Sequence, residues 1–266
     1  MEDNLNQNIQ SLWIGGQLSA VERLCIQSFL DHGHDFHLYT YEGIHNAPEK
    51  AILHDAREII PENEIFKNTA GWGEGSVSGF ADLFRLKLIQ TKGGWWVDMD
   101  VICLKRFDFN DELILCSSYE DEYGQLANNC VFKAPRNSLF ISCCLDELAN
   151  INLKTMPFGT AGPFLFQKIV KDLYLESHVS NYWNFNPISW KNVKPIILGY
   201  MTSKEKVKEL LRPYTKPKTM AGRKIPSSAY AVHFWNEVWK AGKLDKNGNY
   251  PTQSIFEKLK RKHNIR

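Results

Sequence analysis

The order of strand and helix patterns in the N-terminal forty residues limits the fold more than any other feature of the sequence. Residues 9–16 (IQSLWIGG) have the composition of a buried strand, and residues 35–41 (DFHLYTY) predict a second strand. Between them, residues 18–33 have a helical pattern with Ser19 and Glu22 in capping-box spacing and a glycine at the end. A strand–helix–strand unit joins parallel strands by a right-handed crossover. The sequence therefore predicts an α/β fold with a parallel sheet.

Helical and extended patterns continue to the C-terminus without an internal repeat or a clear linker. The strongest helical pattern covers residues 80–94, where two glycines end the helix, and an extended segment follows over residues 95–104. The other expected elements are helices over 47–60, 137–150, 162–175, 204–211 and 252–263, and strands over 112–118, 129–135 and 228–235. The C-terminal half is the less regular one.

Composition excludes some classes of function. The chain has 32 basic and 30 acidic residues, and this net charge of +2 gives no whole-surface attraction to nucleic acid. The six cysteines form no CxxC pair, so zinc-ligand spacing is absent and free thiols in a reducing cytoplasm are the simplest interpretation. The N-terminal residues are polar and lack the apolar core of a signal peptide. No apolar run approaches the roughly 20 residues that span a bilayer. We therefore expect a cytoplasmic protein.

Two carboxylates, Asp98 and Asp100, lie one residue apart inside the hydrophobic run WWVDMDVI. Charges among such neighbours are costly to bury without a partner. Alternate residues of a strand point to the same face, so we expect both carboxylates to converge on one object. They would lie at the carboxyl end of a strand, where open α/β sheets bind ligands. Two hard oxygen ligands suit Mg²⁺ or Mn²⁺. The alternative is a solvated turn, because DxD alone occurs by chance.

A charged pair precedes this motif. Asp82 and Arg85 lie three residues apart on the predicted helix, and hence on one face. The helix runs directly into the carboxylate strand, so the pair could reach the same cleft. Arg85 would then meet a nucleotide, while Asp82 accepts from a ribose or orients Arg85. The alternative is an ordinary surface salt bridge.

The segment SGFADLFRLKLIQTKGGWWVDMDV resembles the DxxR helix and DxD strand of glycosyltransferase family 32. The same layout occurs in bacterial capsular and O-antigen polysaccharide glycosyltransferases and in the glucosyltransferase domain of large clostridial toxins. SLWIGG, GTAGPFLF and AVHFWNEVW resemble the flanking motifs of the family. The resemblance is dense over residues 9–105 and returns near 159–166 and 231–239.

This resemblance implies a GT-A type fold: a Rossmann-like nucleotide-sugar-binding sheet flanked by helices, with a less regular C-terminal acceptor-side lobe. One glycosyltransferase domain would span residues 1–266. Within it we expect a nucleotide-sugar-binding half over 1–105, an acceptor-side half over 106–240 and a basic C-terminal helix over 241–266.

The resemblance also implies a donor site. Trp13 would stack on the nucleotide base, and Asp82 and Arg85 would hold the nucleotide and the donor sugar. Trp96 would border the nucleotide. Trp239 matches the closing Trp of the C-terminal motif and is expected to contact the nucleotide as well. The residue before it, Val238, departs from the family pattern, in which a serine is common at this position.

A metal site is implied by the same motifs. Asp100 would bind the divalent cation directly, and Asp98 would bind it or contact the ribose or a metal-bound water. His233, from a late strand, is expected to complete the coordination shell, with Asn236 as a weaker candidate ligand. A lone histidine beside aromatic residues is more often part of a core, so its partners decide between the two interpretations.

The implied reaction transfers a hexose from a nucleotide sugar, expected to be UDP-linked, with retention of configuration. We expect a front-face substitution with Asp98, Asp100 and Arg85 as catalytic residues and Mn²⁺ (or Mg²⁺) as the Lewis acid. The alternative is double displacement through a carboxylate of Glu120–Glu122, a run better explained as a solvated loop. Asn129 is expected near the donor sugar, with Asn128 as the alternative.

The expected acceptor is a glycan or a lipid-linked oligosaccharide in surface polysaccharide biosynthesis. One alternative is a toxin-like protein glycosyltransferase. Another is a sugar nucleotidyltransferase, which should carry a basic glycine-rich loop near its N-terminus. A third is a non-catalytic carbohydrate-binding protein. The basic C-terminal segment is expected to be a solvated helix, with peripheral attachment at the inner face of the plasma membrane as the alternative.

Overall fold

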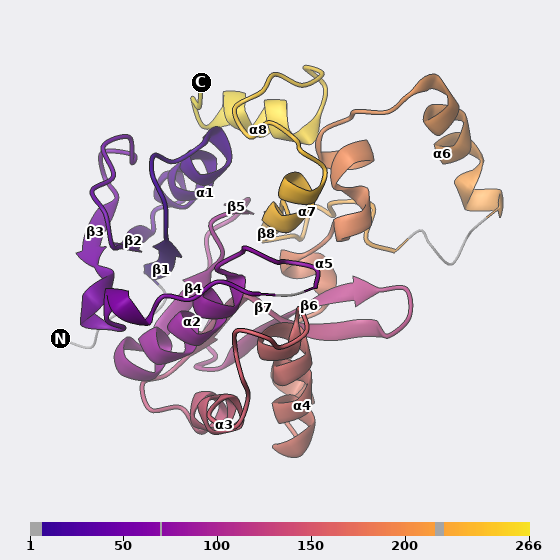
Figure 1. The fold of residues 1–266 in the computed structure, drawn as a ribbon. Coiled ribbons are helices and arrows are strands. Elements are labelled where there is room, and N and C mark those ends of the chain that lie inside the picture. The colour runs from indigo at the N-terminus through magenta and orange to yellow at the C-terminus, as the bar shows by residue number, and fades with distance from the viewer. Residues whose placement is uncertain (1–6, 70, 216–220) are drawn as a thin grey trace.

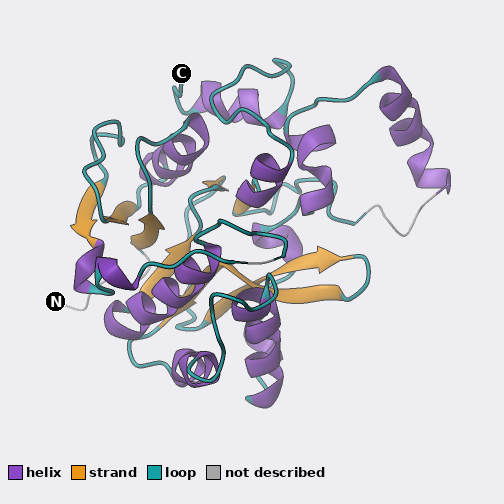
Figure 2. Ribbon diagram, in the orientation of Figure 1, coloured by secondary structure: helices purple, strands orange, loops and turns teal. Residues whose placement is uncertain are grey.

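The computed structural model describes residues 7–69, 71–215 and 221–266. Residues 1–6, the start of the polar N-terminal segment, lie outside the described residues. The described chain is a mixed α/β fold with a mostly parallel sheet flanked by helices, as the sequence predicts (Figure 1; Figure 2). Within the described residues, no helix combines the length and the apolar character needed to cross a bilayer.

The central sheet has six strands in the order β3-β2-β1-β4-β7-β6. The strands β3, β2, β1 and β4 are mutually parallel, and β7 and β6 continue the sheet antiparallel. The strand bounds are β1 (Asn8–Trp13), β2 (Asp35–Thr40), β3 (Ile52–Asp55), β4 (Gly94–Val97), β6 (Ile114–Glu120) and β7 (Gly124–Ala134). A separate antiparallel pair is formed by β5 (Val101–Cys103) and β8 (Ala231–His233).

The predicted strand–helix–strand unit is confirmed. Helix α1 (Ala20–Asp31) connects β1 to the parallel strand β2. Its N-terminus is closed by a complete capping box, in which the side chain of Ser19 accepts from the helix backbone and Glu22 accepts from the N–H of Ser19. Such caps satisfy backbone donors that have no partner within the helix.

The helix predicted over residues 47–60 is wrong. Residues Ile52–Asp55 instead form the edge strand β3, and a short 3₁₀ turn follows. The strand pairs with β2. Its residue His54 contacts two side chains of β2: Nε2 of His54 lies 2.8 Å from Nδ1 of His37, and its ring stacks on that of Tyr39. Pairing satisfies the backbone groups along one edge of β2, and this long-range gain decides over local helical spacing.

Helices cover both faces of the sheet (Figure 1). Neighbouring residues of a strand point to opposite faces. Trp95 therefore packs with α1 and the late helices, whereas Trp96 packs in the cluster that contains α2, α3 and α4. The helix bounds are α1 (Ala20–Asp31), α2 (Ser78–Lys92), α3 (Leu139–Leu148), α4 (Leu165–Asp172), α5 (Tyr182–Phe185), α6 (Ser203–Thr215), α7 (Asn236–Ala241) and α8 (Ile255–Lys262).

Helix α2 ends where the sequence predicts, at Gly93. This residue has a φ of +69°, and a Cβ there would lie 2.9 Å from the backbone nitrogen of Arg136. Only glycine accepts both the left-handed backbone and the close approach. The turn therefore delivers the chain directly from α2 into β4, and this connection fixes the DxxR helix next to the DxD motif.

Candidate active site

A turn between β4 and β5 holds Asp98 and Asp100. The N–H of Asp98 donates to the carbonyl of Cys130 on β7 (2.8 Å), and the N–H of Val101 donates to the carbonyl of Asp98 (3.0 Å). The extended segment predicted over residues 95–104 is therefore interrupted. The two carboxylates converge because the chain turns, and not because they alternate along one strand as the sequence suggested.

The pairing of β8 with β5 brings His233 to the carboxylates. His233 lies opposite Val101 in this antiparallel pair. Its Nε2 lies 3.2 Å from Oδ1 of Asp100, and the N–H of Asn236 donates to the other carboxylate oxygen. The side chains of Asp100 and His233 are 3% and 7% exposed. Both oxygens of Asp100 are thus oriented by residues from the C-terminal part of the chain.

Asp98, Asp100 and His233 form a cluster that suits a divalent cation. Each offers one ligand atom, and these atoms lie within 4.8 Å of one another. Among the described residues, Nδ1 of His233 is buried without a hydrogen-bond partner. Carboxylate oxygens with an imidazole nitrogen form a donor set that Mn²⁺ and similar ions accept. The residues present therefore fit the cation that a DxD motif implies.

The charges in this cluster oppose one another. Burial raises the pKa of Asp98 to about 6, although nearby Arg85 lowers it. Burial also acts to raise the pKa of Asp100, but the adjacent His233 outweighs it and the pKa is lowered. For His233, burial alone would lower the pKa, yet the carboxylate of Asp100 raises it well above its ordinary value. Asp100 and His233 therefore form an ion pair that a cation would replace.

A second group of residues, which we call the Arg85 network, joins α2, β7 and the DxD turn. Nη2 of Arg85 lies 3.2 Å from Oδ1 of Asp82, and Nη1 lies 2.9 Å from Oδ1 of Asp98. Nη1 also donates to the carbonyl of Asn129 (2.7 Å), and Nδ2 of Asn129 donates to Oδ1 of Asp82 (2.8 Å). The structure thus brings together the predicted helix pair, the predicted asparagine and the first DxD carboxylate.

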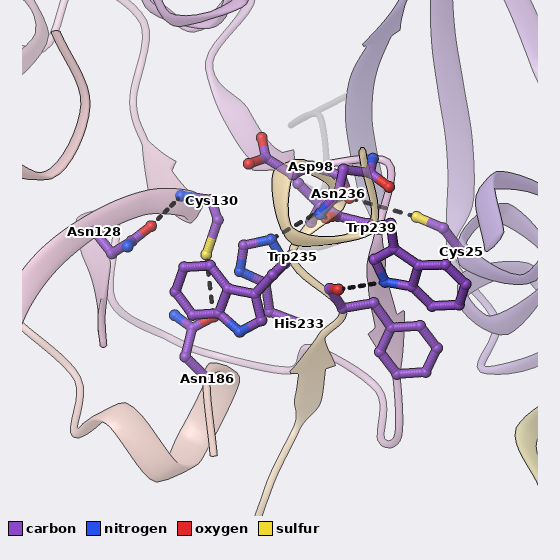
Figure 3. Close-up of polar contacts among 12 residues, drawn as sticks. Cys25, Asp98, Asn128, Cys130, Asn186, His233, Trp235, Asn236 and Trp239 are labelled. Atoms are coloured by element: carbon purple, nitrogen blue, oxygen red, sulfur yellow. Dashed lines mark hydrogen bonds and ion pairs between the residues drawn. The ribbon is translucent and has the colours of Figure 1, made fainter. Parts of the chain in front are cut away.

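Asn128 and Asn129, the two candidates for an asparagine near the donor sugar, face opposite sides of β7. Asn129 faces Asp82, as described above. Nδ2 of Asn128 donates to Oγ of Ser118, and its Oδ1 accepts from the N–H of Cys130 (Figure 3). This geometry favours Asn129 over Asn128 as the donor-site residue.

Trp96 contacts two members of the Arg85 network, Asp98 and Arg85. Its Nε1 donates to Oδ1 of Asp98 (2.9 Å), and the guanidinium carbon of Arg85 lies 4.9 Å from its ring centroid. The side chain is only 2% exposed. Trp96 therefore orients a carboxylate and a guanidinium in this structure, and it has little surface with which to border a nucleotide.

Trp13 lies at the carboxyl end of β1, beside the end of β4 that carries the DxD turn. Its Nε1 donates to the carbonyl of Gly16 (2.8 Å), and Nζ of Lys246 lies 5.9 Å from its ring centroid. Lys246 also contacts Glu22 (2.7 Å) and helps to lower the pKa of Asp100. Sequence reasoning missed this lysine, since no local motif marks it.

Trp239 does not lie where the sequence suggested. It is 0% exposed, and its Nε1 donates to the carbonyl of Phe234 (2.7 Å; Figure 3). Its ring packs against Tyr250 and Phe256. A ring without exposed surface cannot contact a nucleotide in this conformation. The expected nucleotide contact is corrected: Trp239 lies on α7 and its ring belongs to the core.

The tryptophan that does reach the cluster is Trp235, which sequence reasoning did not single out. Its ring stacks on His233 at 4.2 Å between centroids (Figure 3). Its Nε1 donates to the carbonyl of Ile188 (2.8 Å). Its backbone is left-handed, with a φ of 57°, which is unusual for a bulky residue. Such strain persists where the surroundings impose it, often at functional sites. It also turns the chain so that the N–H of Asn236 reaches Asp100.

Asn236 contributes to the cluster through its backbone. Its side-chain Oδ1 is buried and, among the described residues, has no hydrogen-bond partner. A direct bond from this amide to a cation stays a prediction.

Residues 21–119 match the sequence model of a family described as "Glycosyltransferase sugar-binding region containing DXD motif". The matched range covers less than half of the chain and includes the Asp82–Arg85 helix and the DxD turn. It supports a glycosyltransferase with a DXD-type sugar-binding region, and thus a transferase. No curated protein matches the chain.

The similarity of the chain to solved structures is weak. The chain is similar to "PaToxG Glycosyltransferase" at 17% identity, over 82% of this chain and 88% of that one, with a TM-score of 0.46. It is also similar to the "UDP-bound glycosyltransferase domain from the YGT toxin" at 9% identity, over 92% and 94%, with a TM-score of 0.45. These scores are low, so residue roles are taken from the geometry of this chain alone.

Proposed function

We propose that the chain is a retaining, divalent-metal-dependent glycosyltransferase of the GT-A type, similar to family 32. It would move a hexose from a UDP-linked sugar to a hydroxyl of an acceptor. The observation that carries this proposal is the convergence of Asp98, Asp100 and His233 directly beside the Arg85 network. Two carboxylates on one arginine and a third on a buried histidine are costly to gather at one place without a ligand that uses them.

The cation, Mn²⁺ or Mg²⁺, would be held by Asp98, Asp100 and His233. When bound, it would supply positive charge to a diphosphate leaving group. The chain's own residues keep the carboxylates in place for that purpose. Arg85 and Trp96 fix Asp98, and the N–H of Asn236 fixes Asp100. Ligands that are oriented before the reaction need no reorganisation during it.

The donor would lie along the carboxyl edge of the parallel strands. Trp13 and the DxD turn occupy this edge because β1 and β4 run parallel and adjacent. Trp13 would offer its indole ring to the base, and Asp82 and Asn129 would face the sugar. Oγ of Ser76 donates to Glu237 at the start of α7 (2.8 Å), so the glycine-rich segment over residues 71–77, just before α2, is joined to α7.

The acceptor and the location are part of the same proposal. We propose a glycan or lipid-linked oligosaccharide of surface polysaccharide biosynthesis as the acceptor, in the cytoplasm. In the structure the six cysteines are free thiols, which supports a reducing compartment.

A thermal-shift screen of UDP-, GDP- and dTDP-sugars with and without Mn²⁺ tests this proposal. A ligand that binds only the folded state raises its apparent stability. We expect a UDP-sugar to raise the Tm, and to do so only with Mn²⁺. Asp100→Asn should abolish the shift, whereas Asp108→Asn, the same change at an exposed aspartate, should retain it.

Release of UDP from the same donor measures turnover, and the anomeric configuration of the product reports retention. A nucleotidyltransferase would release pyrophosphate instead of UDP. If no nucleotide sugar raises the Tm, or if Asp100→Asn turns over the donor at the wild-type rate, the proposal is wrong.

A further inference from the structure

Helix α6 (Ser203–Thr215) extends away from the rest of the molecule (Figure 1). None of its residues is buried. Four large apolar side chains are exposed on it: Val207 (58%), Leu210 (76%), Leu211 (49%) and Tyr214 (86%). Single exposed apolar residues are common, but a contiguous group of them marks an interaction site.

The four residues form one stripe. Their spacing of i, i+3, i+4 and i+7 places them along one side of a helix that has about 3.6 residues per turn. By the same geometry, Lys204 and Lys208 flank the stripe on one side and Lys206 flanks it on the other. All three lysines are exposed.

The opposite side of α6 faces the protein. Glu209 pairs with Arg212 on the same helix (2.9 Å) and with Arg223 from the following segment. Arg223 also contacts Asn192. These contacts hold the acidic side of the helix toward the body, so the apolar stripe and its lysines point outward.

The region around α6 is strongly basic, although the whole chain is nearly neutral. Residues 191–224 contain ten of the 32 basic residues and only two of the 30 acidic ones. One of the two acidic residues, Glu209, is already paired with arginines. Lys191 is paired with Asp121 (2.7 Å), and the remaining excess of positive charge favours an anionic partner.

We propose that α6 is an interfacial helix that docks the protein on a bilayer surface with anionic headgroups. An apolar stripe flanked by lysines matches both layers of such a surface: the apolar side chains enter the acyl boundary and the lysines remain among the headgroups. An acidic protein groove would satisfy the lysines, but the outward stripe and the excess of positive charge together fit a lipid surface better.

The C-terminal helix α8, for which membrane attachment was considered from the sequence, lacks a free apolar face. Phe256 is fully buried and Leu259 is 9% exposed, and Phe256 packs against Trp239 and Phe234. Its basic residues lie on a helix whose apolar side already belongs to the core. This burial argues against attachment through α8, and the proposed membrane contact is therefore assigned to α6.

Co-sedimentation of the full chain with phosphatidylcholine vesicles, with and without phosphatidylserine, tests the docking. We expect binding to the phosphatidylserine vesicles only, weakened by salt. The double substitution Leu210→Ser with Leu211→Ser should lower the apparent affinity by about tenfold or more. Because neither residue is buried, the fold should survive, and an unchanged Tm verifies this. Leu139→Ser, at an exposed leucine (67%) on α3, is the matched control and should bind as the wild type does.

Charge reversal compares the two basic helices directly. Reversing Lys204, Lys206 and Lys208 to glutamate should reduce binding by about tenfold or more. Reversing Lys258, Arg261 and Lys262 on α8 should have a much smaller effect. The proposal is overturned if the chain does not bind anionic vesicles, if the α6 variants bind unchanged, or if the α8 variant loses more than they do. Vesicle binding does not depend on turnover, so this result is separate from the test of the proposed function.

Discussion

Nε2 of His233 lies 3.2 Å from Oδ1 of Asp100, across two short antiparallel strands that are far apart in the sequence. This contact joins the late part of the chain to the DxD turn. It raises the pKa of His233 and lowers that of Asp100, so each side chain holds the other in its charged form. A cation bound here would replace this ion pair, because His233 can act as a ligand only after it loses its proton.

Replacement of the imidazole should weaken metal binding. We expect His233→Gln to reduce the affinity for Mn²⁺ by about tenfold or more, because one of three clustered donors is lost. Isothermal titration calorimetry with Mn²⁺ measures this. His45→Gln, at an exposed histidine, is the control and should keep the wild-type affinity. Equal affinities of the two variants would show that His233 is not a ligand.

Arg85→Lys should destabilise the protein. An ammonium cannot contact Asp82, Asp98 and the carbonyl of Asn129 together, so buried carboxylates would lose their partner. We expect a loss of about 3 kcal/mol in the free energy of unfolding, measured by urea denaturation. Arg57→Lys, which alters an exposed pair, should leave the midpoint unchanged. A similar midpoint for both variants would contradict the structural role of the Arg85 network.

Trp239 and Trp13 should separate stability from donor binding. Trp239→Phe removes a buried indole and its bond to Phe234, so we expect about 2 kcal/mol less stability with donor affinity unchanged. Trp13→Ala should do the reverse and cost about 1–3 kcal/mol of donor affinity if the ring stacks on the base. Titration of a UDP-sugar with Mn²⁺, together with urea denaturation, measures both quantities. If Trp239→Phe lost donor affinity at unchanged stability, the nucleotide contact expected of Trp239 from the sequence would be right after all.

Acid should weaken the edge of the sheet. Burial lowers the pKa of both His37 and His54 from 6.5, so the folded state holds them neutral while the unfolded state takes up protons first. Their contribution to stability is complete above about pH 6.5 and is lost as the pH falls. Urea denaturation at several pH values checks this. In His54→Gln the decline between about pH 7 and pH 5 should be smaller than in the wild type or in His45→Gln. An equal decline in all three would exclude the pair as its cause.

The sequence predicted more of the α/β core than of the site. It gave α1 through its capping box and α2 through its apolar spacing and terminal glycines, because these signals are local. The sequence wrongly predicted a helix at β3, where apolar residues have helical spacing but the segment pairs with β2 instead. It also misassigned Trp239, because a motif shows which residue types occur but not which of them the late helices cover.

The sequence by itself determined the residue types of the site and the parallel unit that carries it: two aspartates one residue apart, an Asp–Arg pair one turn apart on the preceding helix, and strands that require a crossover. Tertiary structure alone decided which of these residues meet. The turn after β4, the pairing of β5 with β8 and the left-handed backbone of Trp235 bring His233 and the N–H of Asn236 to Asp100. The physical reason is that local signals fix backbone conformation over a few residues, whereas the approach of distant charges depends on the packing and pairing of the whole chain.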